Sequence, residues 1–380
     1  MKYKKLSALL LAAGMISVAA CSTTPAPSAS SDLADRWSAL RTAEPKTHPR
    51  DAAQKLGVSE AELVATNVGK GATRLRDGGD AYQAVYDRLH ELGRIKVITR
   101  NDNAVLERVG TVTKAKLNAD GRVIPGTGFA GGPIDLRFGT DNWRSAFAVL
   151  QPGREGKVSR SLQFFDVHGN AVNKVYLDNE AGVAVFDKLV GDFKAADQSA
   201  ALKVDRTPTK VIRKPNGDVD VKELRDSWNE LTDVHEFPRL LKDLGITREQ
   251  ALDLIGRDAA YRISAQSVQT LLNGAASQAQ PIMVFVSNPG MTQIFSGTVK
   301  TVKATGEWFN VLDPDFNLHL RQAGIDRGWV VKRPAKDGVI TSVEFYDANG
   351  EQVVNFFSRR DRNKEESAMW RNIVASLARP

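Results

Sequence analysis

The sequence predicts an α+β fold formed by a tandem structural duplication, in which each half has a helical pair, a largely antiparallel β-sheet and a terminal helix. The first observation behind this prediction is the length of 380 residues, which is long for one domain. The second is an internal repeat: residues 95–112 match residues 282–299 at a spacing of 187, and residues 161–169 match residues 342–350 at a spacing of 181. Turn residues, not crossover helices, separate the β-rich runs, which favours antiparallel pairing.

The first element predicted in each half is a pair of helices. A tryptophan, Trp37 or Trp228, is followed by a similar segment at residues 56–62 or 244–250. In both segments a Ser or Thr precedes a Glu or Gln by three residues, which is the pattern of a capping box at a helix N-terminus. The two predicted capping boxes are Ser59 with Glu62 and Thr247 with Gln250.

The strands and the terminal helices follow the helical pairs. Five alternating or β-branched runs are predicted strands, at residues 95–99, 161–165, 171–176, 282–287 and 339–346. After each sheet region, apolar residues at helical spacing predict a helix with one face against the core. These residues are Phe186, Leu189 and Phe193 in the first half and Trp370, Ile373 and Leu377 in the second.

The predicted boundaries place the first repeat at residues 33–195 and the second at residues 220–380. The stretch 196–219 is the predicted linker between them. Ahead of the repeats, residues 1–20 are a predicted lipoprotein signal peptide, and residues 21–32 are a Thr/Pro/Ala/Ser-rich tether.

The first 20 residues have the regions of an export signal: a start with three lysines, an apolar stretch at 6–20, and small residues before Cys21. This pattern resembles a bacterial lipobox, in which Cys21 is lipidated and anchors the chain to a membrane. Because Ser22, not aspartate, follows the cysteine, we expect the periplasmic face of the outer membrane. Two alternatives stay open, namely an uncleaved anchor, or a true start codon after Cys21 that leaves the protein in the cytoplasm.

The composition excludes several classes of function. Cys21 is the only cysteine, which excludes disulfides within the chain, cysteine-based zinc clusters and covalent c-type haem. No GxSxG, P-loop or HExxH pattern occurs, and the GxGxxG match at residues 126–131 does not open a predicted helix. The formal net charge of +7 suits an anionic ligand without requiring nucleic acid, so we expect no nucleic-acid partner.

Histidines are the candidates for metal ligation. The five histidines are at positions 48, 90, 168, 235 and 319. Pro238 predicts a break between helices close to His235. A histidine at such a break is most often a capping or packing residue, but it can also present a neutral ring nitrogen to a haem iron. His168 is predicted to lie in a turn, and His319, which alternates with leucines, can face either side of a strand.

Five runs together are similar to one known family: residues 228–235, 282–286, 308–320, 333–338 and 370–371. They resemble the haemin-degrading factor (HemS-like) family, and the resemblance extends from about Trp37 to Leu377. It implies haem b as ligand or substrate, with His235 as the axial ligand of the iron. A haem uptake system is the partner that the resemblance implies, and the lipid on Cys21 is the only expected contact with a membrane.

The resemblance also assigns arginines to the opposite side of the haem, and the matching positions are Arg137 and Arg360. Their guanidinium groups would hold the propionates or order a distal water, with Arg137 as the distal candidate and no catalytic residue assigned. From the residues alone, Arg137 is a surface strand residue and Arg360 a solvated loop charge. Two positions depart from the family: Leu106 stands where some relatives have a second haem-site histidine, and Phe357 where relatives have a tyrosine near the pocket. A second haem site in the first half is therefore not expected.

Three functions compete at this point. Haem trafficking needs only binding, whereas oxidative degradation of haem also needs an external reductant. The export signal puts such a reductant in doubt, since relatives of this family are cytoplasmic. The third hypothesis is a lipoprotein scaffold that kept the duplicated fold but does not bind haem.

Overall fold

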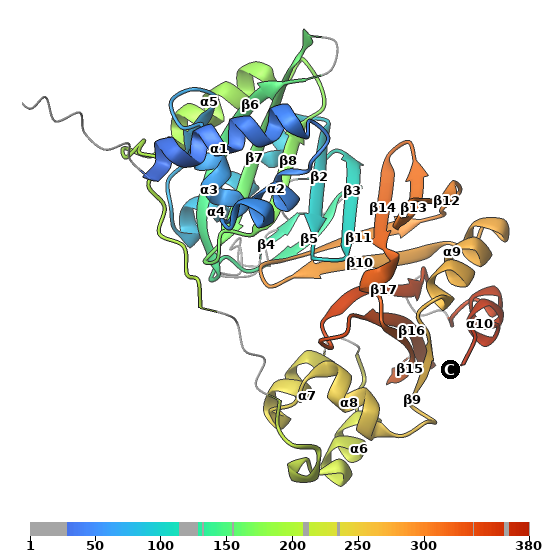
Figure 1. Ribbon diagram of the computed structural model, residues 1–380. Helices are drawn as coiled ribbons and strands as arrows, with labels where there is room; N and C mark the ends of the chain where they lie inside the picture. The colour runs from blue at the N-terminus through green and yellow to red at the C-terminus, as the bar shows by residue number, and fades with distance from the viewer. Residues whose placement is uncertain are drawn as a thin grey trace, which may run out of the picture.

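The computed structural model describes residues 29–113, 128–130, 133–153, 156–207, 213–233, 236–336, 338–360 and 365–379 (Figure 1). Cys21 and His235, which the sequence predicts as a lipidation site and an iron ligand, lie outside the described residues.

The first half begins with helices and continues as antiparallel strands (Figure 1). Its elements are α1 (Ala29–Ala43), α2 (Pro49–Leu56), α3 (Glu60–Ala65), β1 (Ala72–Arg74), α4 (Gly79–Asp87), the 3-10 helix η1 (Leu89–Leu92), β2 (Ile95–Arg100), β3 (Ala104–Gly110), β4 (Gly128–Ala130), β5 (Asp135–Phe138), β6 (Trp143–Pro152), β7 (Val158–Asp166), β8 (Ala171–Leu177) and α5 (Val183–Phe193).

The second half repeats this order. Its elements are η3 (Asn216–Asp218), α6 (Val221–Asn229), α7 (Phe237–Leu244), α8 (Arg248–Ile255), β9 (Ala260–Ser264), α9 (Ser267–Ser277), β10 (Ile282–Asn288), β11 (Met291–Gly297), β12 (Val302–Thr305), β13 (Trp308–Asp313), β14 (Phe316–Arg321), η5 (Gln322–Gly324), β15 (Arg327–Ala335), β16 (Gly338–Tyr346), β17 (Gln352–Ser358) and α10 (Ala368–Ala375). The predicted α+β duplication is confirmed, and so are the five predicted strands and both terminal helices.

The two halves exchange strands, which the sequence repeat did not predict. A nine-stranded sheet has the order β1-β6-β7-β8-β2-β3-β14-β13-β12, and an eight-stranded sheet has the order β4-β5-β11-β10-β17-β16-β15-β9. Strands β4 and β5 of the first half therefore extend the sheet of the second half beyond β11. In return, β12 to β14 of the second half extend the sheet of the first half beyond β3. Each sheet is completed by the other half.

Side-chain burial explains why the exchanged strands stay in place. Leu136 and Phe138 of β5 pack into the core of the first half, although β5 pairs with β11 of the other sheet. Leu318 and Leu320 of β14 pack into the core of the second half, although β14 pairs with β3. Each exchanged strand is thus held by hydrogen bonds to one half and by apolar contacts to the other.

Two asparagines at equivalent positions of the repeat join the halves. The Asn101 amide donates to the carbonyl oxygens of Ser287 (3.1 Å) and Val353 (2.9 Å). The Asn288 amide donates to the carbonyl oxygens of Arg100 (3.0 Å) and Val172 (2.8 Å). Because 187 residues separate the two asparagines, the spacing of the repeat, the contacts follow the same twofold relationship as the sheets.

The predicted caps are confirmed for one half and in part for the other. Ser59 and Glu62 form the reciprocal capping box at the start of α3. At the start of α8, Thr247 accepts from the Gln250 backbone N–H, but the Gln250 side chain does not return to the cap. It donates instead to the carbonyl oxygen of Lys214 (2.5 Å) in the segment that leads into α6. This amide ties the segment to the helical layer.

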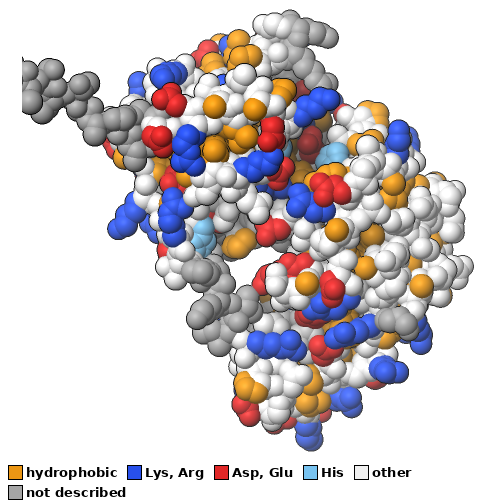
Figure 2. Space-filling model, in the orientation of Figure 1, with side chains coloured by type: hydrophobic (Ala, Val, Ile, Leu, Met, Phe, Trp, Pro, Cys, Tyr) orange, Lys and Arg blue, Asp and Glu red, His pale blue; other side chains and the backbone are white. Residues whose placement is uncertain are grey.

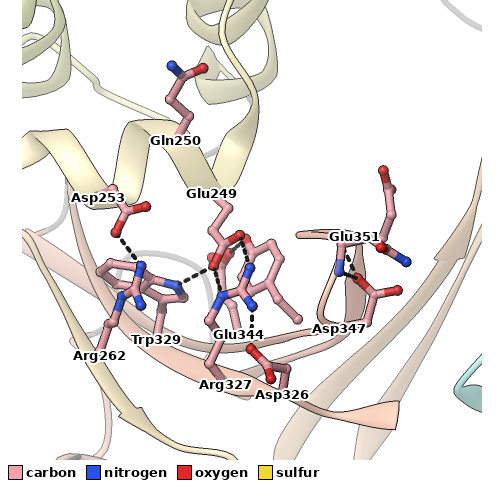
Figure 3. A network of polar contacts seen from close by, with 12 residues as sticks. Glu249, Gln250, Asp253, Arg262, Asp326, Arg327, Trp329, Glu344, Asp347 and Glu351 are labelled. Carbon is pink, nitrogen blue, oxygen red and sulfur yellow. Dashed lines mark hydrogen bonds and ion pairs between the residues drawn. The ribbon is translucent and has the colours of Figure 1, made fainter. Parts of the chain in front are cut away.

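Polar contacts also hold α8 on the edge of the second sheet (Figure 3). The Glu249 carboxylate of α8 accepts from Arg327 Nη2 (2.7 Å) and Trp329 Nε1 (3.2 Å), both on β15. Further along the helix, Asp253 forms an ion pair with Arg262 of β9 (2.7 Å). These contacts fix the helical layer beside the face of the sheet on which the candidate site lies.

Candidate functional site in the second half

One face of the second sheet packs on α9 and α10 to form the core, and the opposite face carries the candidate site. Directly opposed residues of antiparallel strands point to the same side of a sheet. Register pairs therefore place Arg137, Phe285, Asn355 and Phe357 on this opposite face together with Arg333. We call this set of five residues the second-half face.

Aromatic and cationic side chains alternate across the second-half face. The Phe285 and Phe357 rings make an edge contact, with centroids 5.1 Å apart. The Arg333 guanidinium carbon lies 5.5 Å from the Phe357 ring centroid and 5.5 Å from that of Phe237 at the start of α7. Such a surface offers both apolar contact and positive charge to a flat anionic ligand.

A buried charge network lies on the same side of the sheet, because Glu344 is the register partner of Asn355. The fully buried Glu344 carboxylate accepts two hydrogen bonds of 2.7 Å from Arg248 of α8 and lies 3.6 Å from Arg333. Burial by itself raises the pKa of Glu344, but the charges and hydrogen bonds of Arg248 and Arg333 outweigh it and lower the pKa to about 2. Burial, reinforced by the neighbouring Arg248, lowers the pKa of Arg333 to about 10. Two arginines around one carboxylate leave this region with an excess positive charge.

Two buried polar atoms of the second-half face lack a partner among the described residues. Arg333 Nε and Asn355 Oδ1 are buried and make no hydrogen bond with any described residue. Buried donors and acceptors without a partner are rare in folded proteins, since each costs about 1–3 kcal/mol. Unsatisfied groups beside an aromatic, cationic surface fit a ligand that brings its own polar atoms.

The segment between α6 and α7 borders the candidate site. Helix α6 ends at Asn229 and α7 begins at Phe237, so the predicted break between helices near His235 is confirmed. The Glu236 carboxylate accepts from the backbone N–H groups of Thr232 (2.8 Å) and Asp233 (3.1 Å), which links the start of α7 to the segment after α6. Lys336 N–H donates to the Thr232 carbonyl oxygen (2.9 Å) and fixes the turn to the end of β15.

Arg137 reaches the second sheet only because β5 is exchanged. It lies opposite Thr292 of β11, its side chain is about half exposed, and it forms an ion pair with Asp135. Partial burial lowers its pKa to about 10. Arg360 follows β17 and lies near Glu366, whose carboxyl pKa is raised by burial while Arg371 and Arg360 oppose that rise. The structure thus brings Arg137 to the second-half face and places Arg360 just after β17, the strand that carries Phe357.

The two departures from the family pattern have clear structural settings. Leu106 of β3 is fully buried in the core, so no ligand reaches that position. Phe357 stands on the second-half face and supplies an apolar ring there. His168 lies in the β7–β8 turn, as predicted, with its ring nitrogen 2.7 Å from the Asp205 carbonyl oxygen.

The sequence did not single out Arg333, Arg248 or Glu344 as site residues. The run that begins at Arg333 was noticed only as part of the resemblance, and its role depends on pairing with β16. Arg333 lies between Lys332 and Pro334 and outside the five predicted strands, so no local pattern indicated that it is buried. The described residues contain no group of three or more His, Cys, Asp or Glu side chains suited to a metal ion. They also contain no helix long and apolar enough to cross a membrane.

The sheet of the first half carries a cavity on the equivalent face, with a volume of about 840 Å³. His48 before α2, Arg100 of β2, Lys174 and Tyr176 of β8, and His319 of the exchanged β14 are among its lining residues. The open question about His319 is thereby answered, because its ring points to the cavity side of the strand. Charged side chains of both signs are interspersed over the face of the molecule drawn in Figure 2, which is hollowed between the first half and the α6–α8 region.

Comparisons with known proteins agree on one family. The family model described as the haemin-degrading HemS.ChuX domain matches residues 57–193 and 245–377. The hemin transport protein HmuS of Yersinia pestis is 34% identical over 345 residues, which cover 91% of this chain and 97% of that protein.

Solved structures show the same similarity. The holo form of PhuS, a heme-binding protein from Pseudomonas aeruginosa, has a TM-score of 0.84 at 39% identity, covering 92% of this chain and 99% of PhuS. The heme-degrading enzyme ChuS from Escherichia coli O157:H7 has a TM-score of 0.82 at 32% identity, covering 92% and 99%. Both halves and their exchanged strands therefore fall within the region that matches.

Proposed function

Because the chain belongs to the haemin-degrading HemS/ChuX family, we propose that it binds haem b for the use of haem iron, at the face of the second sheet next to the α7 turn. One structural observation carries the assignment to this face. Here alternating aromatic and cationic side chains surround two buried polar atoms, Arg333 Nε and Asn355 Oδ1, that have no described partner.

In this proposal His235 would supply a nitrogen ligand to the haem iron. The rings of Phe285 and Phe357 would pack against the porphyrin, while Arg137 and Arg360 would receive the propionates. Three observations support these roles: the helix break beside His235, the position of β5 on the second sheet, and the edge contact of the two phenylalanines. The bound haem itself supplies the redox-active iron.

Haemin titration tests the proposal. We expect a saturable Soret band for the wild-type protein and loss of at least most of its intensity, or a shift of its position, for His235→Ala. His168→Ala is the matched control, because His168 lies in a turn of the first half, and it should bind like the wild type. Absence of any Soret change in the wild type would contradict haem binding and favour a scaffold that kept only the fold.

A reductant added to the loaded protein separates trafficking from degradation. With catalase present to remove free peroxide, decay of the Soret band indicates that the ring is opened, and a stable band indicates that haem is only carried. We propose both uses of the site as alternatives, since HmuS is described as a transport protein and ChuS as a heme-degrading enzyme.

We also propose that Cys21 carries a lipid that anchors the chain at the periplasmic face of the outer membrane. The support is the sequence alone: three lysines, an apolar stretch and small residues precede the only cysteine. Labelled palmitate should enter the wild-type protein and not Cys21→Ser, and only the wild type should sediment with outer membranes. Equal recovery of both proteins in the cytoplasmic fraction would contradict the anchor and favour a start codon after Cys21.

A further inference from the structure

The cavity of the first half is related to the proposed haem site by the internal repeat. Val105 and Thr292 are equivalent, since 187 residues separate them. Val105 pairs with His319 across β3 and β14, whereas Thr292 pairs with Arg137 across β11 and β5. His319 therefore takes the place in the first-half cavity that Arg137 takes on the second-half face. Tyr176 likewise takes the place of Phe357, at the spacing of 181.

The place that corresponds to His235 holds no metal ligand. At the spacing of 188 that relates the two helical pairs, this position is Thr47, whose hydroxyl donates to Glu44 (2.7 Å). The next residue, His48, accepts from the Arg50 backbone N–H (3.3 Å) and lies 3.3 Å from Arg100 Nη1. A guanidinium only donates, so His48 Nδ1 is an acceptor and Nε2 carries the proton. In this tautomer the remaining ring nitrogen of His48 is a donor and offers iron no lone pair.

The neighbouring amide fixes the opposite form of His319. Asn310 Nδ2 donates to the carbonyl oxygens of Lys303 (3.1 Å) and Trp308 (3.3 Å), so its oxygen faces His319 Nδ1 at 2.7 Å. His319 Nδ1 therefore carries the proton, and Nε2 has a free lone pair. Burial lowers the pKa of His319, which keeps the ring neutral.

Arg100 is a buried cation without a carboxylate partner. The residue is 8% exposed, and its guanidinium lies 3.4 Å from the Asn101 carbonyl oxygen and 3.3 Å from His48 Nδ1. None of the ion pairs among the described residues includes Arg100. Apart from the exposed Lys46, the other charges that line the cavity are paired: Lys174 with Glu60, Lys55 with Glu44, Glu107 with Lys96 (3.1 Å), and Arg321 with Glu307 (3.7 Å) and Asp51 (3.9 Å). An unpaired guanidinium at a cavity wall is a ready partner for an anion.

We propose that the first-half cavity is a second ligand site for a planar, metal-free carboxylate, with Arg100 binding the carboxylate and His319 Nε2 accepting a hydrogen bond from a ring N–H. Trp308 and Tyr176 supply aromatic contacts, and the volume of about 840 Å³ falls within the range of small-molecule pockets. A ring-opened tetrapyrrole, the product class of haem degradation, has this chemistry. That choice of occupant rests on the proposed function, whereas the carboxylate site itself does not.

Calorimetric titration with biliverdin, metal-free protoporphyrin IX and haemin tests the site in wild-type and His235→Ala proteins. We expect one equivalent of biliverdin to bind to both proteins. Arg100→Gln should weaken this binding at least about tenfold, because a charge-assisted hydrogen bond is lost, and His319→Gln should weaken it severalfold. Arg94→Gln and His90→Gln are the matched controls, since neither residue lines the cavity, and both should bind like the wild type.

Several results would overturn the proposal. The proposal fails if neither metal-free tetrapyrrole binds, or if Arg100→Gln leaves their binding unchanged. It also fails if only haemin binds and His319→Gln abolishes that binding, because this result would indicate an iron site. Binding of protoporphyrin IX without biliverdin would keep the carboxylate site and reject the ring-opened occupant. If Arg100→Gln melts at a markedly lower temperature, Arg100→Lys and His319→Gln decide the result. If the wild-type protein binds the metal-free tetrapyrroles but not haemin, only the proposed function is rejected.

Discussion

The two halves attach their helical layers to their sheets with opposite charges. In the first half, Glu60 at the start of α3 forms a buried ion pair with Lys174 of β8. The repeat spacing of 188 puts Arg248 of α8 at the place of Glu60, and Arg248 pairs with Glu344 of β16. The first-half pair is a one-to-one match, whereas in the second half Arg333 joins as a second cation.

This difference shows how one duplicated frame supports two different surfaces. The backbone positions, the twofold contacts and the exchanged strands are shared by both halves. The charges that sit on this frame differ, so the second-half face has surplus positive charge beside aromatic rings, and the first-half cavity has one unpaired arginine beside two neutral histidines. The repeat therefore determines the backbone arrangement of the two halves, whereas the individual side chains determine what each surface can bind.

The largest expected effect comes from removing the central acid of each network. Glu344→Ala leaves the buried Arg333 and the partly buried Arg248 without a carboxylate and should lower the free energy of unfolding by about 5 kcal/mol, while Glu60→Ala leaves one ammonium group and should cost about 3 kcal/mol. Urea unfolding at neutral pH measures both. Asp226→Ala, which breaks an exposed pair with Lys222 in α6, is the control and should cost less than about 0.5 kcal/mol. Equal losses for the two buried acids would mean that the second arginine adds nothing.

The pH dependence of stability should report the same network. The folded-state pKa of Glu344 is about 2, below the unfolded value of about 4.3, so its stabilisation is present above pH 4.3 and is lost as the pH falls toward 2. The shift corresponds to about 3 kcal/mol. We therefore expect Glu344→Gln to be less stable than the wild type by about this amount at pH 7, with the gap closing between pH 5 and pH 2. A gap that stays constant over this range would show that the carboxylate is not ionised in the folded protein.

The sequence predicted the repeated parts of the fold because they depend on local patterns. The capping box at Ser59, the terminal helix at Trp370 and the break before α7 each follow from residues close together in the chain. The exchange of β5 and β14 depends on which sheet completes which strand, a long-range choice that no local pattern encodes.

The same reason limits what the sequence could say about the candidate sites. Arg137 was selected through the resemblance, and its place on the second sheet follows from the exchange. The leucine at position 106 was the reason not to expect a second haem site in the first half, and this side chain is fully buried in the core. His319 comes to the first-half cavity from the other half of the chain, so no inspection of the first repeat could have found it.

The smallest effect concerns the twofold contact between the halves. Asn101→Ala and Asn288→Ala each remove an amide that donates to two carbonyl oxygens of the opposite half, and each should cost about 2 kcal/mol. Asn101 should cost slightly more, because its oxygen accepts from two N–H groups, those of Asn103 and Ala104, whereas the Asn288 oxygen accepts from one, that of Gly290. Urea unfolding with the exposed Asn372→Ala of α10 as control measures the losses.

The double variant tests whether the two asparagines act as one unit. Asn101 bonds to the carbonyl oxygen next to Asn288, and Asn288 bonds to the carbonyl oxygen next to Asn101, so the two losses should not add. We expect the double variant to cost about 1 kcal/mol less than the sum of the single variants, because the first substitution already loosens the contact that the second one removes. Strict additivity would mean that each half holds its own end of the interface independently, and the twofold relationship would then describe the sequence without coupling the halves.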